Sequence, residues 1–469
     1  MNEAQSLFAV LRQSAKPDIV DAIERLVHEA PDRKLGRVNA LAFAAGHGLD
    51  DEQTINAFLH ASRIGLFDIS WNILCPGCGG VLDANTSLKT VQSDQYACAL
   101  CAAGYEPTLD EMVEVTFTVS PRIRHIEAHN PHTLPPIEYF RQIYWGSGID
   151  MPEDDYEEKV DEFLLEALEL PAGEKAVISL QLPEGFVIIF EPVTHAAQFI
   201  DVKGPPTKER TQLSLVFDRG HQHRETLELR PGPVRITVEN HTGDRTLPSV
   251  CMANDALHHL LGRRRPFLTA KRVLSNQTFR DIYRTDTLGV DQRLKITSLT
   301  FLFTDLRGST ELYERVGDLA AFDLVKTHFA ILHEIVSDEA GAVVKTIGDA
   351  VMATFPTPDR AVTAAMRMRE AMRSLNADRG NEDLLLKIGI HEGPCIAVSL
   401  NERQDYFGQT VNIASRVQHL ATSHEIFATR SVLDDPAASR VLAASGLMPT
   451  SHPVALRGIT DQINIFTIP

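Results

Sequence analysis

The chain has 469 residues, which is too long for one typical domain and predicts about three. Its hydrophobic content of 43% is typical of globular proteins, and its formal net charge of −18 argues against broad binding to nucleic-acid phosphates. No apolar stretch approaches the roughly 18 residues of a membrane-spanning helix, and the polar start Met1–Gln5 does not resemble a signal peptide, so we expect a cytoplasmic protein without a membrane partner.

Residues 1–70 are predicted to form a helical module. Asp50 with Gln53 is typical of a helix start, Gly65 of its end, and Phe67 opens an alternating strand pattern. This order fits a winged-helix module or a small helical interaction domain. We favour the interaction domain because no recognition helix rich in lysine and arginine is visible.

Two cysteine pairs in residues 71–110 predict a zinc ribbon. The pairs are Cys75 with Cys78 and Cys98 with Cys101. Two such turns supply four sulfurs to one tetrahedral Zn²⁺, and four protein ligands leave no open position, so the predicted zinc is structural. The alternatives are four unligated thiols or a redox pair, and the redox pair lacks a strand-to-helix context.

Residues 111–265 are predicted to be a β-rich, sandwich-like regulatory domain. The expected strands are 113–119, 176–182, 186–190, 213–217 and 234–238, interrupted by an acidic helical insertion over 153–168. The histidine pairs His221 with His223 and His258 with His259 fit a metal site less well than solvated loops. A sensing or docking role is expected here, and residues 266–295 are predicted to be a linker with one helix over 269–283.

The segment 301–310 predicts a strand that delivers Asp305 to a helix start. Its Gly308-Ser309-Thr310 turn leaves backbone N–H groups at a helix N-terminus, where an anion such as phosphate is favoured. An ordinary capped turn explains this segment equally well. The segments further along the chain decide between the two interpretations.

Residues 342–355 predict two strands that meet at a Gly-Asp turn, with Asp349 at the tip. If this hairpin lies beside the first strand, Asp305 and Asp349 converge, and two carboxylates with phosphate oxygens suit Mg²⁺. Further on, Asn412 and Arg416 are four residues apart on one helix face and can point at a single ligand. The order strand, helix, strand, strand, helix, strand predicts a ferredoxin-like α+β core within a multidomain chain.

Three segments together resemble the catalytic domain of class III nucleotidyl cyclases. They are Phe303–Thr310, Lys345–Ala350 and Asp405–Arg416, and the resemblance covers residues 296–469. The region upstream, including Leu74–Gly80, is similar to an uncharacterised zinc-ribbon-containing module that precedes some bacterial cyclase domains, and this resemblance implies no function.

The cyclase resemblance implies a two-metal reaction, in which the ribose 3′-hydroxyl of ATP attacks the α-phosphorus in line and releases pyrophosphate. Asp305, the Leu306 carbonyl and Asp349 would hold two Mg²⁺ or Mn²⁺ ions. Arg416 would neutralise charge on the α-phosphoryl oxygens and Asn412 would orient the ribose. Arg457 stands where the family usually places a basic residue for the terminal phosphates, often lysine.

The resemblance also implies the base and the assembly. Lys345 as donor and Asp405 as acceptor suit adenine, whereas guanylate cyclases of the family typically have glutamate and a small residue there. The metal aspartates and the remaining residues would come from different protomers, which implies a homodimer. The predicted function is an adenylate cyclase with an N-terminal regulatory region. The alternatives are a guanylate cyclase, a nucleotide-binding regulatory protein without turnover, and a transcription factor built on the helical start.

Overall fold

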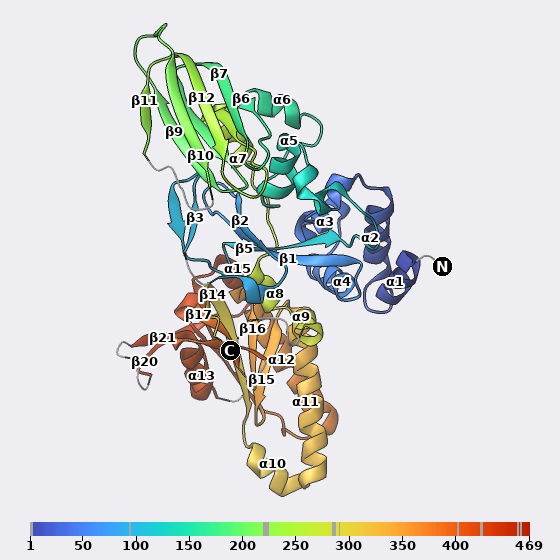
Figure 1. The fold of residues 1–469 in the computed structure, drawn as a ribbon. Coiled ribbons are helices and arrows are strands. Elements are labelled where there is room, and N and C mark those ends of the chain that lie inside the picture. The colour runs from blue at the N-terminus through green and yellow to red at the C-terminus, as the bar shows by residue number, and fades with distance from the viewer. Residues whose placement is uncertain are drawn as a thin grey trace. The chain divides into compact units, whose positions relative to one another are not determined.

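The structure, a computed structural model, describes residues 3–92, 95–218, 225–283, 288–289, 291–400, 403–422, 425–456, 459 and 462–469, without the side chain of Thr310. The chain forms two compact units, whose elements are labelled in Figure 1. The first unit contains Met1–Thr86, Asp94–Pro107 and Glu111–Leu268, and the second contains Ser87–Ser93, Thr108–Asp110 and Thr269–Pro469. Across the described ranges, no helix is long and apolar enough to cross a membrane.

The first unit begins with helices and a small antiparallel sheet. The helices are α1 (Glu3–Leu11), α2 (Pro17–Glu29), α3 (Ala40–His47) and α4 (Asp51–Arg63). The expected cap is present, since the Asp50 side chain accepts from the Gln53 amide at 2.9 Å. Strand β1 (Phe67–Leu74) pairs with β2 (Val81–Asn85) and β5 (Val113–Val119). Strand β5 was expected in the middle domain, but both of its faces are buried and it pairs with β1.

Two sheets form the β-rich middle predicted from the sequence. One contains β7 (Lys175–Leu182), β10 (Thr211–Phe217) and β12 (Gly232–Asn240), and the other contains β6 (Leu164–Ala167), β8 (Gly185–Glu191), β9 (Ala196–Val202), β11 (Leu227–Leu229) and β13 (Ser249–Met252). Residues of both sheets, such as Ile236 and Ile189, enter one hydrophobic core. The region is therefore a sandwich, flanked by α5 (Pro136–Tyr139), α6 (Tyr156–Asp161) and α7 (Asp255–Gly262).

The helical insertion predicted over 153–168 is only partly correct. Helix α6 occupies its centre, and the chain then enters β6, which pairs with β13. The glutamates and leucines of this segment favour a helix, but the ladder to β13 determines the structure of its second half.

The second unit is built on one eight-stranded sheet. Its strand order is β15-β16-β14-β17-β19-β21-β20, and β18 also pairs with β17. The strands are β14 (Leu294–Leu306), β15 (Ala342–Ile347), β16 (Ala350–Phe355), β17 (Leu386–Leu400), β18 (Arg403–Phe407), β19 (Ile426–Thr429), β20 (Thr450–Val454) and β21 (Ile463–Ile468). The predicted hairpin lies beside β14, because Thr304 is opposite Val351 in the ladder.

Helices cover both faces of this sheet. They are α8 (Ala270–Leu274), α9 (Gln277–Ile282), α10 (Ser309–Val316), α11 (Asp318–Asp338), α12 (Pro358–Arg379), α13 (Gln409–Leu420), α14 (Arg430–Leu433) and α15 (Pro436–Ala444). Helices α11 and α12 pack on the face that carries Ile426 and Ala428, while α13 packs with Ile465 on the other. The single helix expected over 269–283 is wrong, since Asn276 caps a new helix by accepting from the Phe279 amide at 3.0 Å.

Candidate active site and metal centre

Two carboxylates meet at one end of the central strands of the second unit. Asp305 lies at the end of β14, opposite Lys387 of β17, and Asp349 lies in the turn between β15 and β16. Burial raises the pKa of Asp305, and the negative charge of Asp349 raises it further. The Lys387 ammonium opposes this effect, with its Nζ 4.0 Å from Asp305 Oδ2.

The Asp349 carboxylate has an unsatisfied oxygen. Its Oδ2 is buried and lacks a hydrogen-bond partner among the described residues. A buried, unpartnered carboxylate oxygen costs free energy unless a cation or donor reaches it. Together with the raised pKa of Asp305, this oxygen fits a hard divalent cation held between the two aspartates.

The chain turns sharply after Asp305. Gly308 has φ = 70°, in the left-handed region, and precedes the first turn of α10 at Ser309. A residue with a Cβ is strained at this φ, so the turn favours glycine. The N-cap residue Gly308 has no side chain that could cap this helix, and backbone donors at a helix N-terminus favour an anion.

A second polar pair joins β15 to β18. Lys345 Nζ of β15 donates to Asp405 Oδ2 of β18 at 2.6 Å. Asp405 is 6% exposed, and its Oδ1 also accepts from the Tyr406 amide at 2.9 Å. The pair thus presents an ammonium donor beside a carboxylate acceptor.

Helix α9 holds the two backbones that carry this pair. The guanidinium of Arg280 donates to the carbonyls of Val344, at 3.2 Å, and Gln404, at 3.0 Å. Each of these residues directly precedes one member of the pair. The Gln277 side chain accepts from the Val343 amide at 2.8 Å, where the β15–β16 register shifts. No sequence pattern indicates Arg280, because its partners are carbonyls 64 and 124 residues away.

Asn412 and Arg416 lie on α13, whose residues Ile413 and Val417 are buried against the sheet. Asn412 is exposed and Arg416 is half-buried. Neither side chain has a hydrogen-bond or ion-pair partner within the described part of the chain. Both are therefore free to meet a ligand or another protomer.

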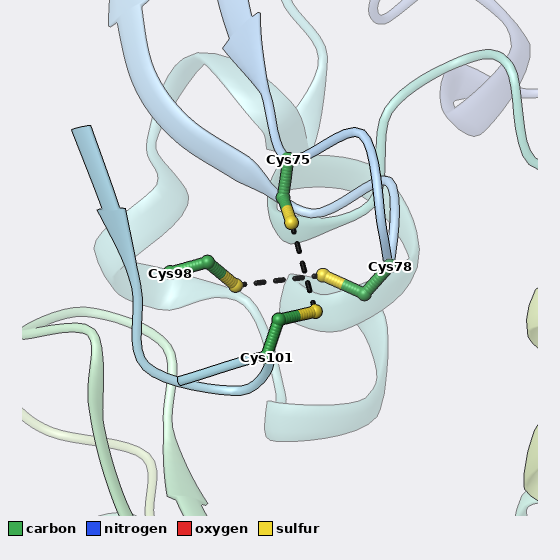
Figure 2. A group of neighbouring side chains, drawn as sticks. All are labelled: Cys75, Cys78, Cys98 and Cys101. Atoms are coloured by element: carbon green, nitrogen blue, oxygen red, sulfur yellow. Dashed lines mark hydrogen bonds between the residues drawn. The ribbon is translucent and has the colours of Figure 1, made fainter. Parts of the chain in front are cut away.

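The four predicted zinc ligands converge in the first unit (Figure 2). Cys75 follows β1, Cys98 ends β3 (Tyr96–Cys98), and Cys101 precedes β4 (Ala103–Tyr105). Cys75 Sγ lies 3.6 Å from Cys101 Sγ, and Cys78 Sγ lies 3.7 Å from Cys98 Sγ. A tetrahedron with Zn–S bonds of about 2.3 Å has edges of about 3.8 Å, so the four sulfurs fit one Zn²⁺.

These thiols also perturb one another. Hydrogen bonding with Cys101 lowers the pKa of Cys75 and raises the pKa of Cys78. Among the described residues, this is the one group of three or more side chains placed to share a metal, and it does not include His258 or His259. His221, His223, Arg457 and the side chain of Thr310 lie outside the described residues.

The fold and these residues define the class. Residues 292–441 match the sequence profile described as the adenylate and guanylate cyclase catalytic domain, and they form a class III cyclase catalytic domain. Residues 1–281 match the family of unknown function DUF5939, more than half of the chain, and the chain belongs to that family.

Known cyclases resemble the C-terminal part of the chain. The adenylate cyclase of Anabaena cylindrica is 28% identical over 185 residues, 36% of each protein. Adenylate cyclase 2 of Rhizobium meliloti is 30% identical over 189 residues, 38% of this chain and 50% of that protein. Guanylate cyclase 32E of Drosophila melanogaster also matches. The chain thus spans half or less of the length of these curated relatives.

Among solved structures, the adenylyl cyclase CyaB from P. aeruginosa aligns with 38% of this chain and 96% of its own. The sequence identity is 23% and the TM-score is 0.33.

Proposed function

We propose that this protein is an adenylate cyclase that converts ATP to 3′,5′-cyclic AMP and pyrophosphate. The observation that carries the proposal is the Lys345–Asp405 pair, which lies in the same unit as the two converging aspartates. It supplies a base-selecting donor and acceptor in the same unit as a metal-binding carboxylate pair. A guanylate cyclase and a nucleotide-binding protein without turnover are the alternatives.

Asp305, the carbonyl of Leu306 and Asp349 would hold two divalent cations, either Mg²⁺ or Mn²⁺. The unpartnered Oδ2 of Asp349 supports this assignment. When bound, these ions supply Lewis-acid activation of the ribose 3′-hydroxyl and charge neutralisation on the phosphates. Burial and, after it, the charge of Asp349 raise the pKa of Asp305, and bound cations would offset both effects.

The chain's own residues would bind and orient the nucleotide. The backbone N–H groups after Gly308, at Ser309 and Thr310, would contact phosphate oxygens. Arg416 would pair with oxygens of the α-phosphoryl group, Asn412 would hydrogen-bond the ribose, and Arg457 would bind the terminal phosphates.

The base would be selected by hydrogen bonding. Lys345 can donate to the N1 atom of adenine, and Asp405 can accept from the exocyclic amine. Guanine presents an N–H and a carbonyl at the corresponding edge. The Lys345 donor would then face another donor, and the Asp405 acceptor would face another acceptor. Buried groups without a partner cost about 1–3 kcal/mol each, so ATP is preferred.

The active site would be shared between two protomers of a homodimer. The free side chains of Asn412 and Arg416 support this arrangement, because each would contact a nucleotide whose metal ions are held by the aspartates of the partner chain. The four-cysteine site would hold a structural Zn²⁺ in the regulatory region.

Mixing two inactive variants tests the shared site. We expect Asp305→Ala and Arg416→Ala each to be nearly inactive, and an equal mixture to recover about a quarter of the wild-type activity. Half of the exchanged dimers would be mixed, and each would have one intact site of two. Absence of recovery, with subunit exchange verified by differently tagged chains, would refute a site built between protomers.

A further inference from the structure

A basic cavity in the first unit belongs neither to the cyclase site nor to the cysteine cluster. It has a volume of about 150 Å³, and cationic side chains of Arg33, Lys34, Arg37, Arg141 and Arg265 line it. Glu153 is the one carboxylate in its lining. This concentration of positive charge occurs in a chain whose formal net charge is −18. The positive charge of the cavity lining is therefore opposite in sign to the net charge of the chain.

The cavity already favours a carboxylate of the chain itself. Lys34 Nζ lies 2.8 Å from Glu153 Oε2, and both side chains are substantially exposed, at 43% and 59%. The hydrogen bond from Lys34 lowers the pKa of Glu153, and the charges of Arg33 and Arg141 lower it further. Exposed pairs of this kind contribute little stability, so an incoming anion can displace Glu153 at small cost.

Arg37 is held in an unusual conformation at this cavity. Its φ is 49°, in the left-handed region that a residue with a Cβ rarely adopts. Its guanidinium donates to the carbonyl of Ile143, and burial lowers its pKa. The arginine keeps its charge despite this shift, because a guanidinium is not deprotonated in proteins. A half-buried cation with a strained backbone is a candidate for a ligand contact.

Gln142, one of the residues that line the cavity, also has an acceptor without a partner among the described residues. Gln142 donates through Nε2 to Glu138 at 2.6 Å, but its Oε1 is buried and lacks a hydrogen-bond partner among the described residues. A ligand that donates a hydrogen bond would satisfy this acceptor. An organic phosphate with free hydroxyl groups provides both the anion and the donor.

We propose that this cavity binds a small hydroxylated phosphate ester, such as a sugar phosphate or the ribose-phosphate part of a nucleotide. The phosphate replaces the Glu153 carboxylate among the cations, and a hydroxyl donates to Gln142 Oε1. The site lies wholly in the DUF5939 region, so it is a site for an effector and is separate from the substrate.

Calorimetric titration of the full-length chain with ribose 5-phosphate tests the proposal, with neutral ribose as the control probe. We expect ribose 5-phosphate to bind and ribose not to bind at the same millimolar concentrations. The double variant Arg33→Glu and Lys34→Glu should weaken binding at least ten-fold, because it reverses two exposed charges, and Glu153→Gln should tighten it. Asp349→Ala, in the other unit, should leave binding unchanged.

Three results would overturn the proposal. They are no heat from the wild-type chain, equal binding by the charge-reversed variant, and loss of binding in Asp349→Ala, which would assign the signal to the catalytic domain. Circular dichroism would establish that the variants are folded, and Glu153→Gln remains informative if the double variant is not.

Discussion

Replacing Lys345 with alanine should reduce the preference for ATP over GTP. The substitution removes the ammonium that faces Asp405 at 2.6 Å and would donate to adenine. Among the described residues, it leaves the Asp405 carboxylate, which is 6% exposed, with the Tyr406 amide as its one remaining partner. The acceptor for the exocyclic amine is therefore retained and the donor is lost.

The expected size follows from the cost of one unpaired group. Leaving adenine N1 without a donor in a closed site costs about 1–3 kcal/mol, which corresponds to roughly 5- to 150-fold in kcat/KM for ATP. The effect on folding should be small, because the Lys345 side chain is 43% exposed and a half-exposed ion pair contributes little. Activity and stability should thus be affected very differently.

The assay is kcat/KM for ATP and for GTP, measured with the wild type, Lys345→Ala and the control Lys326→Ala on the exposed side of α11. We expect Lys326→Ala to match the wild type for both nucleotides. An unchanged ratio of ATP to GTP in Lys345→Ala, with the protein folded, would refute base selection by this pair.

Three further predictions concern other parts of the chain. Arg280→Ala should raise KM for ATP several-fold, because two backbone carbonyls lose charge-assisted hydrogen bonds of about 1.5–3 kcal/mol each. The surface variant Arg373→Ala should leave KM unchanged. Equal KM values for the two variants would exclude a positioning role for Arg280. Burial lowers the pKa of His328 to about 4, below its ordinary 6.5, so its contribution to stability is complete above pH 6.5 and is lost as the pH falls towards 4. The loss in the free energy of unfolding is roughly 3 kcal/mol, and His328→Phe should make that free energy, measured by urea unfolding, depend less on pH. The same pH dependence in the variant and the wild type would contradict the lowered pKa of His328. Metal analysis should find one zinc ion per chain in the wild type and much less zinc in Cys75→Ser. Native protein without zinc would argue against the metal centre.

The catalytic domain was predictable because its signals are local. The apolar run before Asp305, the glycine turn after it and the hairpin around Asp349 each determine their own conformation, and strand pairing then brings the two aspartates together. The cysteine pairs are similar, since their spacing alone implied the cluster that Figure 2 shows. The roles assigned to these residues remain predictions.

The remaining features depend on contacts between distant segments. Strand β5 pairs with β1, and β6 pairs with β13, although neither partner could be read from the local pattern. The clamp by Arg280 and the cavity around Arg37 likewise join residues that are far apart in the chain. Periodicity indicates which face of an element is buried, but it does not identify the surface that covers it.

The most direct test of the account is the identity of the product. Purified full-length protein would be incubated separately with ATP and with GTP in the presence of Mn²⁺, and the products separated by chromatography. The account predicts 3′,5′-cyclic AMP from ATP, little cyclic GMP from GTP, and no product from Asp349→Ala. Cyclic GMP as the main product, or bound ATP without any cyclic product, would contradict it.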